Sequence, residues 1–168
     1  MKLTQLVLDE LEREAELSRR ALGEVPAGKG DWKPHERSMI FGYLASMVAN
    51  IPNWVAMMVN QPELDIAPPG GGQQKPETGL DSAGLLASLD KSMAAARSAL
   101  QQTTDEHLMT GWRLLAGGTP VIETSRYIMI RDTINHWVHH RGQMTVYLRL
   151  MGAKVPALYG PSADDRNF

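Results

Sequence analysis

The sequence predicts an all-α protein, a four-helix bundle with a long loop between its second and third helices. Four amphipathic stretches are separated by segments rich in glycine and proline. Aromatic residues make up only 6% of the 168 residues, while alanine, leucine and ten methionines supply much of the apolar mass. This composition favours helices, because strands prefer β-branched and aromatic side chains. We expect residues 1–168 to form a single domain.

The four helices are predicted at about residues 3–22, 38–60, 82–102 and 123–151. Residues 61–79 contain four prolines and four glycines and are predicted to form the long loop. Residues 105–120 are predicted to form an irregular connection. Pro52 lies inside the second helix and has no N–H, so the Val48 carbonyl loses its helical hydrogen bond and we expect a kink.

Composition and charge exclude several classes of function. The net charge of -2, without a basic face, argues against nucleic-acid binding. The absence of cysteine excludes disulfides, thiolate metal sites and a cysteine nucleophile. The N-terminal segment is charged too early for a signal peptide. The 22 uncharged residues 38–59 contain Asn50, Pro52 and Asn53, so we interpret them as a buried helix and not as a membrane span. We expect a cytoplasmic protein.

Three of the five histidines lie in the fourth helix, in the run HWVHH at residues 136–140. At about 100° per residue, His136 and His140 are about 40° apart on one face and one turn from each other. Two neutral imidazoles at this spacing can bind one transition metal. The alternative is a pair of solvent-exposed or hydrogen-bonded core histidines, because this spacing arises easily by chance. Gln143 and Tyr147 extend the same polar stripe, which is typical of a pocket lining.

The opposite face of the fourth helix is apolar and carries Ile130, Ile134, Trp137, Met144 and Leu148. A helix that is apolar on two sides is buried on two sides, so this face predicts a homodimer. The alternative is a central helix that its neighbours in the same chain cover.

Two blocks of sequence carry a family resemblance. The run HWVHHRGQMTVYLRLMGAKVPALYGPSADD, residues 136–165, is similar to the C-terminal block of DinB/YfiT-like proteins. The segment DWKPHERSMIFGYLASMVANIPNW, residues 31–54, resembles the second-helix block of that family, while the middle third matches only in helix layout. The resemblance implies a four-helix bundle, often dimeric, in which three histidines bind a divalent metal such as nickel or zinc.

The resemblance places two of those metal ligands at His136 and His140 and the third on the second helix, where the family pattern reads roughly LAxHVAxIPxW. Met47 stands at that third position here, and helical periodicity independently places it inward. A thioether suits Cu(I) better than Zn²⁺ or Ni²⁺. We therefore expect a divalent metal to bind weakly, or no metal to bind at all.

Three other residues are candidates for a replacement ligand, namely Asp132, His35 and Glu36. Asp132 lies one turn before the histidine pair and could instead orient an imidazole. His35 matches a PH-x-x-SM stretch of the family and is the candidate catalytic base or substrate contact; the alternative is an ordinary loop histidine. We predict that His107 is a solvated surface residue and that Arg141 has a structural role between helices.

Two functions follow from these observations. Characterised relatives include thiol-dependent transferases and isomerases, in which a metal-bound thiol is deprotonated and becomes the nucleophile. The first function is therefore a metal-dependent thiol transferase, isomerase or hydrolase, and any thiol has to come from a cosubstrate. The alternative is a metal-free protein that binds a small apolar ligand in a pocket lined by Met47, Met129, Tyr43 and Tyr147, or a purely structural dimer. The sequence does not identify a substrate.

Overall fold

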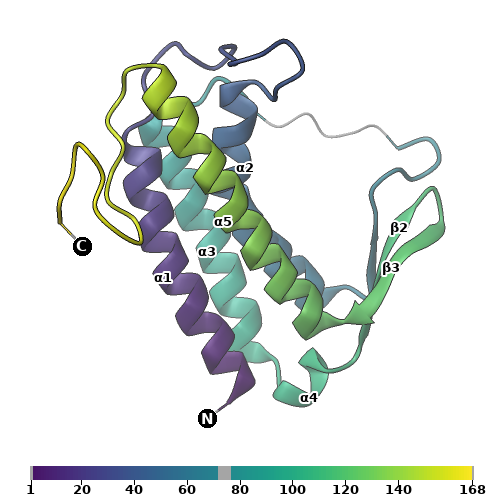
Figure 1. Ribbon diagram of the computed structural model, residues 1–168. Coiled ribbons are helices and arrows are strands. Elements are labelled where there is room, and N and C mark those ends of the chain that lie inside the picture. Colours follow the sequence, from purple (N-terminus) through teal and green to yellow (C-terminus); the bar gives the residue numbers. More distant parts are fainter. Residues whose placement is uncertain (1, 72–76, 168) are drawn as a thin grey trace.

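The computed structural model describes residues 2–71 and 77–167, and four long helices packed side by side dominate it (Figure 1). The long helices are α1 (Leu3–Gly23), α2 (Phe41–Asn60), α3 (Ser82–Gln102) and α5 (Arg126–Leu150). A short helix, α4 (Asp105–Leu108), and the strands β1 (Glu63–Asp65), β2 (Gly111–Ala116) and β3 (Thr119–Ser125) lie at one end of the bundle. The predicted bundle is present, but the fold is mostly helical with a small sheet and not all-α.

The sheet corrects the prediction that residues 105–120 form an irregular connection. β2 and β3 pair as an antiparallel hairpin whose two-residue turn is Gly117 and Gly118, with φ of 60° and 80°. Both turn positions require positive φ, which glycine adopts without a steric penalty. Pro120 fits into β3 because this strand lies at the edge of the sheet, in the order β1-β2-β3. A Gly-Gly pair between two apolar stretches indicates a hairpin. The signal is weak here because the strands are short and Pro120 lies in the second one.

β1 brings part of the predicted long loop into the sheet, where it runs parallel to β2. The Asp65 carboxylate accepts hydrogen bonds from the backbone N–H groups of Ala67 at 2.9 Å, Gly117 at 3.0 Å and Gly118 at 2.7 Å. These bonds, that of Ala67 above all, lower the pKa of Asp65. The segment after α2 is thereby tied to the hairpin turn. Residues 72–76 of the predicted loop lie outside the described residues.

The ends of the helices follow from local capping. Asp81 caps α3, because its carboxylate accepts a hydrogen bond from the Gly84 N–H at 2.8 Å. The second and fourth helices each begin three residues later than predicted, at Phe41 and Arg126. For the fourth helix the reason is that residues 123–125 belong to β3, whose pairing with β2 holds them extended.

The core lies between the four long helices, and α2 contributes the largest share of its buried apolar side chains. The face of α5 that predicted a homodimer is buried within the chain itself; it comprises Ile130, Ile134, Trp137, Met144 and Leu148. Neighbouring helices thus cover this face. The homodimer stays a prediction, but the apolar face of α5 no longer supports it. Within the described ranges, no helix combines the length and the hydropathy needed to cross a bilayer.

One hydrogen bond between α2 and α5 compensates for the proline inside α2. Because Pro52 has no N–H, the Val48 carbonyl lacks the donor that helix geometry normally supplies four residues on. The indole N–H of Trp137 donates to this carbonyl at 2.7 Å, and both residues are fully buried. A side chain of α5 therefore satisfies the group that the proline leaves free. The bond also sets which part of α5 lies against α2.

We predict that Trp137→Phe lowers the free energy of unfolding by about 2–4 kcal/mol, because it leaves a buried carbonyl without a donor and opens a small void. In a Pro52→Ala background the same substitution should cost about 1 kcal/mol less, since the new backbone N–H at position 52 can satisfy Val48. Urea unfolding of the four proteins measures this coupling as a double-mutant cycle. Strictly additive costs would show that the indole and the proline are not linked.

Candidate functional site

His136 and His140 lie one turn apart on α5, and their rings face each other. Their Nε2 atoms are 2.5 Å apart and their ring centroids 4.4 Å apart, so the predicted pairing on one helix face is present. His140 is buried, with 8% of its surface exposed, whereas His136 is exposed. The pair therefore lies at the edge of the bundle and not in its interior, where the sequence had placed it.

Neighbouring side chains hold both imidazoles. Nδ1 of His140 lies 2.9 Å from Oε1 of Gln143. An amide oxygen only accepts, so this contact favours a proton on Nδ1 of His140, which leaves the lone pair of the neutral ring on Nε2. His136 packs edge-on against Trp54 of α2, with 5.7 Å between the ring centroids. The pair thus lies where α5 meets α2.

Both imidazoles favour the neutral form. Partial burial, and then the charges of His140 and His139, lower the pKa of His136. Burial also lowers the pKa of His140, against the opposing effect of its hydrogen bond to Gln143. A neutral imidazole is the form that can bind a metal or accept a proton.

The histidine pair by itself does not fit a divalent metal site. Two nitrogens bound tetrahedrally to one zinc at about 2.0–2.1 Å lie roughly 3.3 Å apart, so the Nε2 atoms would have to separate by about 0.8 Å. Catalytic zinc also needs about three protein ligands. Across residues 2–71 and 77–167, no group of three or more histidine, cysteine, aspartate or glutamate side chains is placed to hold a metal. The donor set in the described chain is therefore incomplete.

None of the predicted replacement ligands contacts the histidine pair through a hydrogen bond or an ion pair among the described residues. Asp132 is exposed, and its carboxylate forms an ion pair with the neighbouring arginine at 3.2 Å. His35 is exposed in the loop before α2, where its Nδ1 accepts a hydrogen bond from the backbone N–H two residues on, at 3.2 Å. Glu36 is exposed in the same loop.

Met47 is half-buried on α2 and lines a cavity of 490 Å³ together with Tyr43, Asn50 and Trp54. His136 lines a different cavity, and Trp54 belongs to the walls of both. These two cavities thus do not place Met47 and His136 on one common wall.

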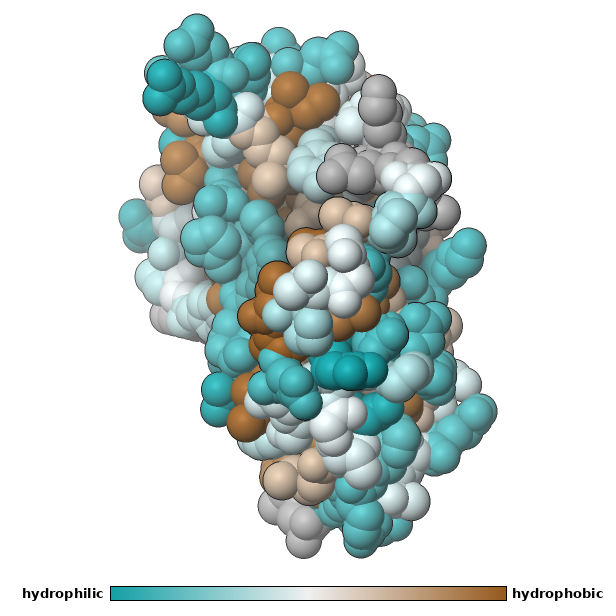
Figure 2. Space-filling model, turned by 90° about the vertical axis from the view of Figure 1, so that its right-hand side faces the viewer, coloured by the Kyte–Doolittle hydropathy of each residue, from teal (hydrophilic) through white to brown (hydrophobic). Residues whose placement is uncertain are grey.

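The cavity beside His136 has a volume of 370 Å³, which falls within the range of about 300–1,000 Å³ that is usual for small-molecule pockets. It lies between α2, α5 and the sheet and is lined by Trp54, Met57, Met58, Leu64, Ile66, Trp112, Leu114, Ile122, Met129, Asp132, Thr133 and His136. Figure 2 views the molecule from the side of the β2–β3 hairpin and shows hydrophobic side chains gathered near the middle of this face.

This cavity differs from the pocket that the sequence predicted. Of the four residues expected to line one pocket, only Met129 lines the cavity beside His136. Met47 and Tyr43 line the other cavity, and Tyr147 packs edge-on against Trp32 at 5.5 Å. The sheet residues of the lining were missed because the hairpin was missed, and its Gly-Gly turn is the signal that could have found them.

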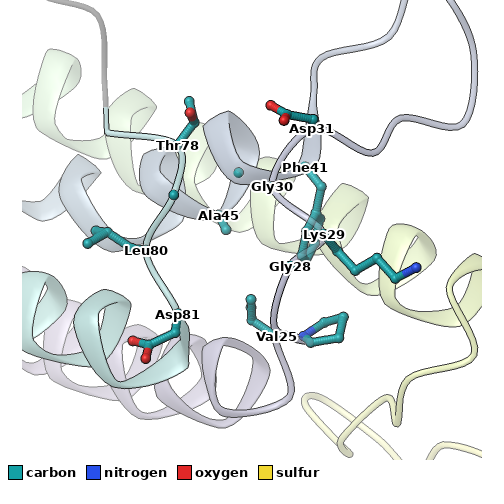
Figure 3. A pocket seen from close by; sticks show the side chains of 13 residues that line it. Val25, Gly28, Lys29, Gly30, Asp31, Phe41, Ala45, Thr78, Leu80 and Asp81 are labelled. Carbon is teal, nitrogen blue, oxygen red and sulfur yellow. The ribbon is translucent and has the colours of Figure 1, made fainter.

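A further cavity of 280 Å³ lies at the N-terminal end of α2, between residues 25–31 and residues 78–81 (Figure 3). Its charged groups do not converge. Thr78 and Lys29 lie on opposite sides of the cavity, and the Lys29 side chain points away from Thr78. The Asp81 carboxylate caps α3. A Cβ added at Gly30 or Gly42 would come within 2.5 or 2.1 Å of the Thr78 carbonyl oxygen. These close backbone contacts give this region a structural role.

Arg141 has the structural role predicted for it. Its guanidinium group, only 1% exposed, forms an ion pair with the Glu14 carboxylate and donates to the Ser18 hydroxyl at 3.1 Å and to the Tyr159 hydroxyl at 2.5 Å. Burial, and then the hydrogen bond to Glu14, raise the pKa of Tyr159 to about 12. Arg141 therefore joins α5 to α1 and to the C-terminal segment.

His107 differs from its prediction as a solvated surface residue. It is partly buried, and its Nε2 lies 2.9 Å from the Val59 carbonyl oxygen. The prediction was wrong because α4 brings this imidazole to the C-terminal end of α2, where free carbonyl groups need donors.

The chain is similar to proteins of one family, and a sequence model described as the DinB family matches residues 1–167. The Bacillus subtilis (strain 168) protein YrdA is 53% identical over 32 residues, so the match spans only 19% of each chain. The crystal structure of a DinB-like protein from Bacillus cereus ATCC 10987 has a TM-score of 0.68 at 23% identity, over 91% of this chain and 95% of the other.

Two further crystal structures share the fold. The DinB-like protein YjoA from Bacillus subtilis has a TM-score of 0.68 at 17% identity, over 96% of this chain and 99% of the other. A conserved protein from Enterococcus faecalis has a TM-score of 0.60 at 19% identity, over 89% of this chain and 96% of the other. At such identities the likeness shows the fold alone.

We predict that neutral His140 exists mainly as the Nδ1–H tautomer, because the Gln143 amide oxygen accepts its proton. Nitrogen-15 NMR of the imidazole rings measures the tautomer, with exposed His139 as the internal reference. Gln143→Leu should shift His140 toward the Nε2–H form, and Gln143→Glu, which keeps an acceptor oxygen, should not. An unchanged tautomer in the leucine variant would mean that Gln143 does not orient the ring.

Proposed function

The chain belongs to the DinB family, and from this premise we propose that it binds a small, largely apolar ligand in the cavity beside His136. The observation that carries the proposal is a 370 Å³ cavity whose wall is mainly methionine, leucine, isoleucine and tryptophan side chains. Removing apolar ligand surface from water into such a wall stabilises the complex by about 25 cal/mol per Å². Asp132 and His136 form the polar end of the lining.

The state of the histidine pair supports binding without a metal. A neutral imidazole offers one donor and one acceptor, and the second ring already engages Nε2 of His136 at 2.5 Å. The remaining ring nitrogen of His136 can form a hydrogen bond with a polar group of a ligand in the adjoining cavity. In this proposal the pair orients the ligand.

A metal-dependent enzyme that uses a thiol cosubstrate is the second candidate function. The observation that favours it is the convergence of the two Nε2 atoms, together with the Gln143 hydrogen bond to the far nitrogen of His140. Carboxylates and amides commonly orient metal-binding imidazoles in this way. The incomplete donor set, with Met47 at the position of the third histidine, places this candidate second.

The ligand proposal can be tested with 2-acetylnaphthalene as the probe. We expect micromolar or weaker binding that raises the Tm of the protein. Ile122→Trp, on the exposed strand β3, should fill the cavity and weaken binding by about tenfold or more. Val121→Trp is the matched control, because Val121 is also exposed but does not line the cavity. Equal loss of binding in both variants, or no binding to the unaltered protein, would contradict the proposal.

The metal candidate can be tested with Met47→His. If the site retains the remaining geometry for a metal, this variant should bind Zn²⁺ or Ni²⁺ on the order of 100-fold more tightly than the unaltered protein. Calorimetric titration of protein purified without a nickel column measures the affinity. Asn50→His, one turn further along α2, is the control and should gain little.

Removing His140 from the Met47→His protein should abolish the gain. If the unaltered protein already binds either metal as tightly as the variant, Met47 does not weaken metal binding. The metal-dependent enzyme would then become the first candidate function.

A further inference from the structure

Trp112 on β2 has an indole N–H that no described residue accepts. The side chain is completely buried, and Nε1 has no hydrogen-bond partner among the residues that the structure describes. The other fully buried tryptophan, Trp137, donates to a carbonyl at 2.7 Å. A buried donor without a partner is unfavourable and uncommon in folded proteins, so it points to a partner outside the described residues.

Trp112 also forms part of the wall of the cavity beside His136. The ring has no surface exposed to solvent, so a small molecule in this cavity reaches the N–H only when the wall opens toward it. On the basis of the proposed function, we infer that the ligand carries a carbonyl group that accepts a hydrogen bond from Trp112. The apolar part of the ligand then fills the space between α2 and the hairpin.

A neutral carbonyl fits this position better than a carboxylate. Most of the lining is apolar, including Met58, Leu64 and Leu114, and such side chains cannot solvate an anion. The Asp132 carboxylate also lines the cavity. A single indole N–H cannot offset the desolvation of an ionised group. A ketone, ester or amide oxygen loses much less solvation and gains one hydrogen bond.

The other buried donor without a partner, Nε of Arg126, has a different role. Its guanidinium group donates to the carbonyl oxygens of Gly111 at 2.6 Å and Gln61 at 3.3 Å and to the Thr110 hydroxyl at 2.6 Å. Gln61 is the C-cap residue of α2, so the positive charge lies at the negative end of a helix. Arg126 is not among the residues that line the cavity.

Two probes of nearly equal shape test the inference. In 2-acetylnaphthalene a C=O group occupies the place that a C=CH₂ group occupies in 2-isopropenylnaphthalene. The unaltered protein should bind the ketone about tenfold more tightly, which corresponds to about 1.4 kcal/mol and to one net hydrogen bond. In Trp112→Phe the two affinities should become equal, mainly through weaker ketone binding. Trp54→Phe, on the same cavity wall, should keep the preference.

Indole NMR keeps the test decisive if Trp112→Phe does not fold. In the unaltered protein, the ketone should move the Trp112 N–H resonance downfield, and the hydrocarbon should move it far less. Equal affinities for both probes would overturn the role of Trp112 and leave the proposed apolar site standing. If neither probe binds, the proposed function itself fails.

Discussion

The hydrogen bond from Trp137 to the Val48 carbonyl is the constraint on which the arrangement of α2 and α5 depends. Pro52 creates the free carbonyl, and the Trp137 indole on another helix supplies its donor. With Trp137 fixed there, α5 has one register against α2. That register brings His136 against Trp54 and sends Arg141 to the opposite side, where it meets α1.

The short run of residues 136–141 therefore serves two purposes. Its histidines form a neutral pair at the edge of the bundle, and its arginine closes a buried polar cluster between α1, α5 and the C-terminal segment. A buried arginine paired with a carboxylate tolerates little change, because removal of one partner leaves the other charge unpaired. The face of α5 that carries Arg141 thus holds the helix against α1, and another face of the same helix lines the cavity.

The cavity itself arises from the meeting of the bundle with the small sheet. Helices α2 and α5 supply one part of its wall and β1, β2 and β3 the other, and Asp65 ties the strands together at the hairpin turn. Within the described residues no group of three or more histidine, cysteine, aspartate or glutamate side chains is placed to hold a metal, whereas most of the cavity wall is apolar. The proposed binding of an apolar ligand rests on this wall.

The sequence by itself determined the four long helices and the shared helix face of His136 and His140. These features depend on local capping or on angles around one helix axis, which residue spacing specifies. Only the tertiary structure decided that a sheet forms, that His136 lies at the surface and that Met47 faces another cavity. Strand pairing and depth of burial depend on residues distant in the chain, and periodicity within one helix carries no information about them.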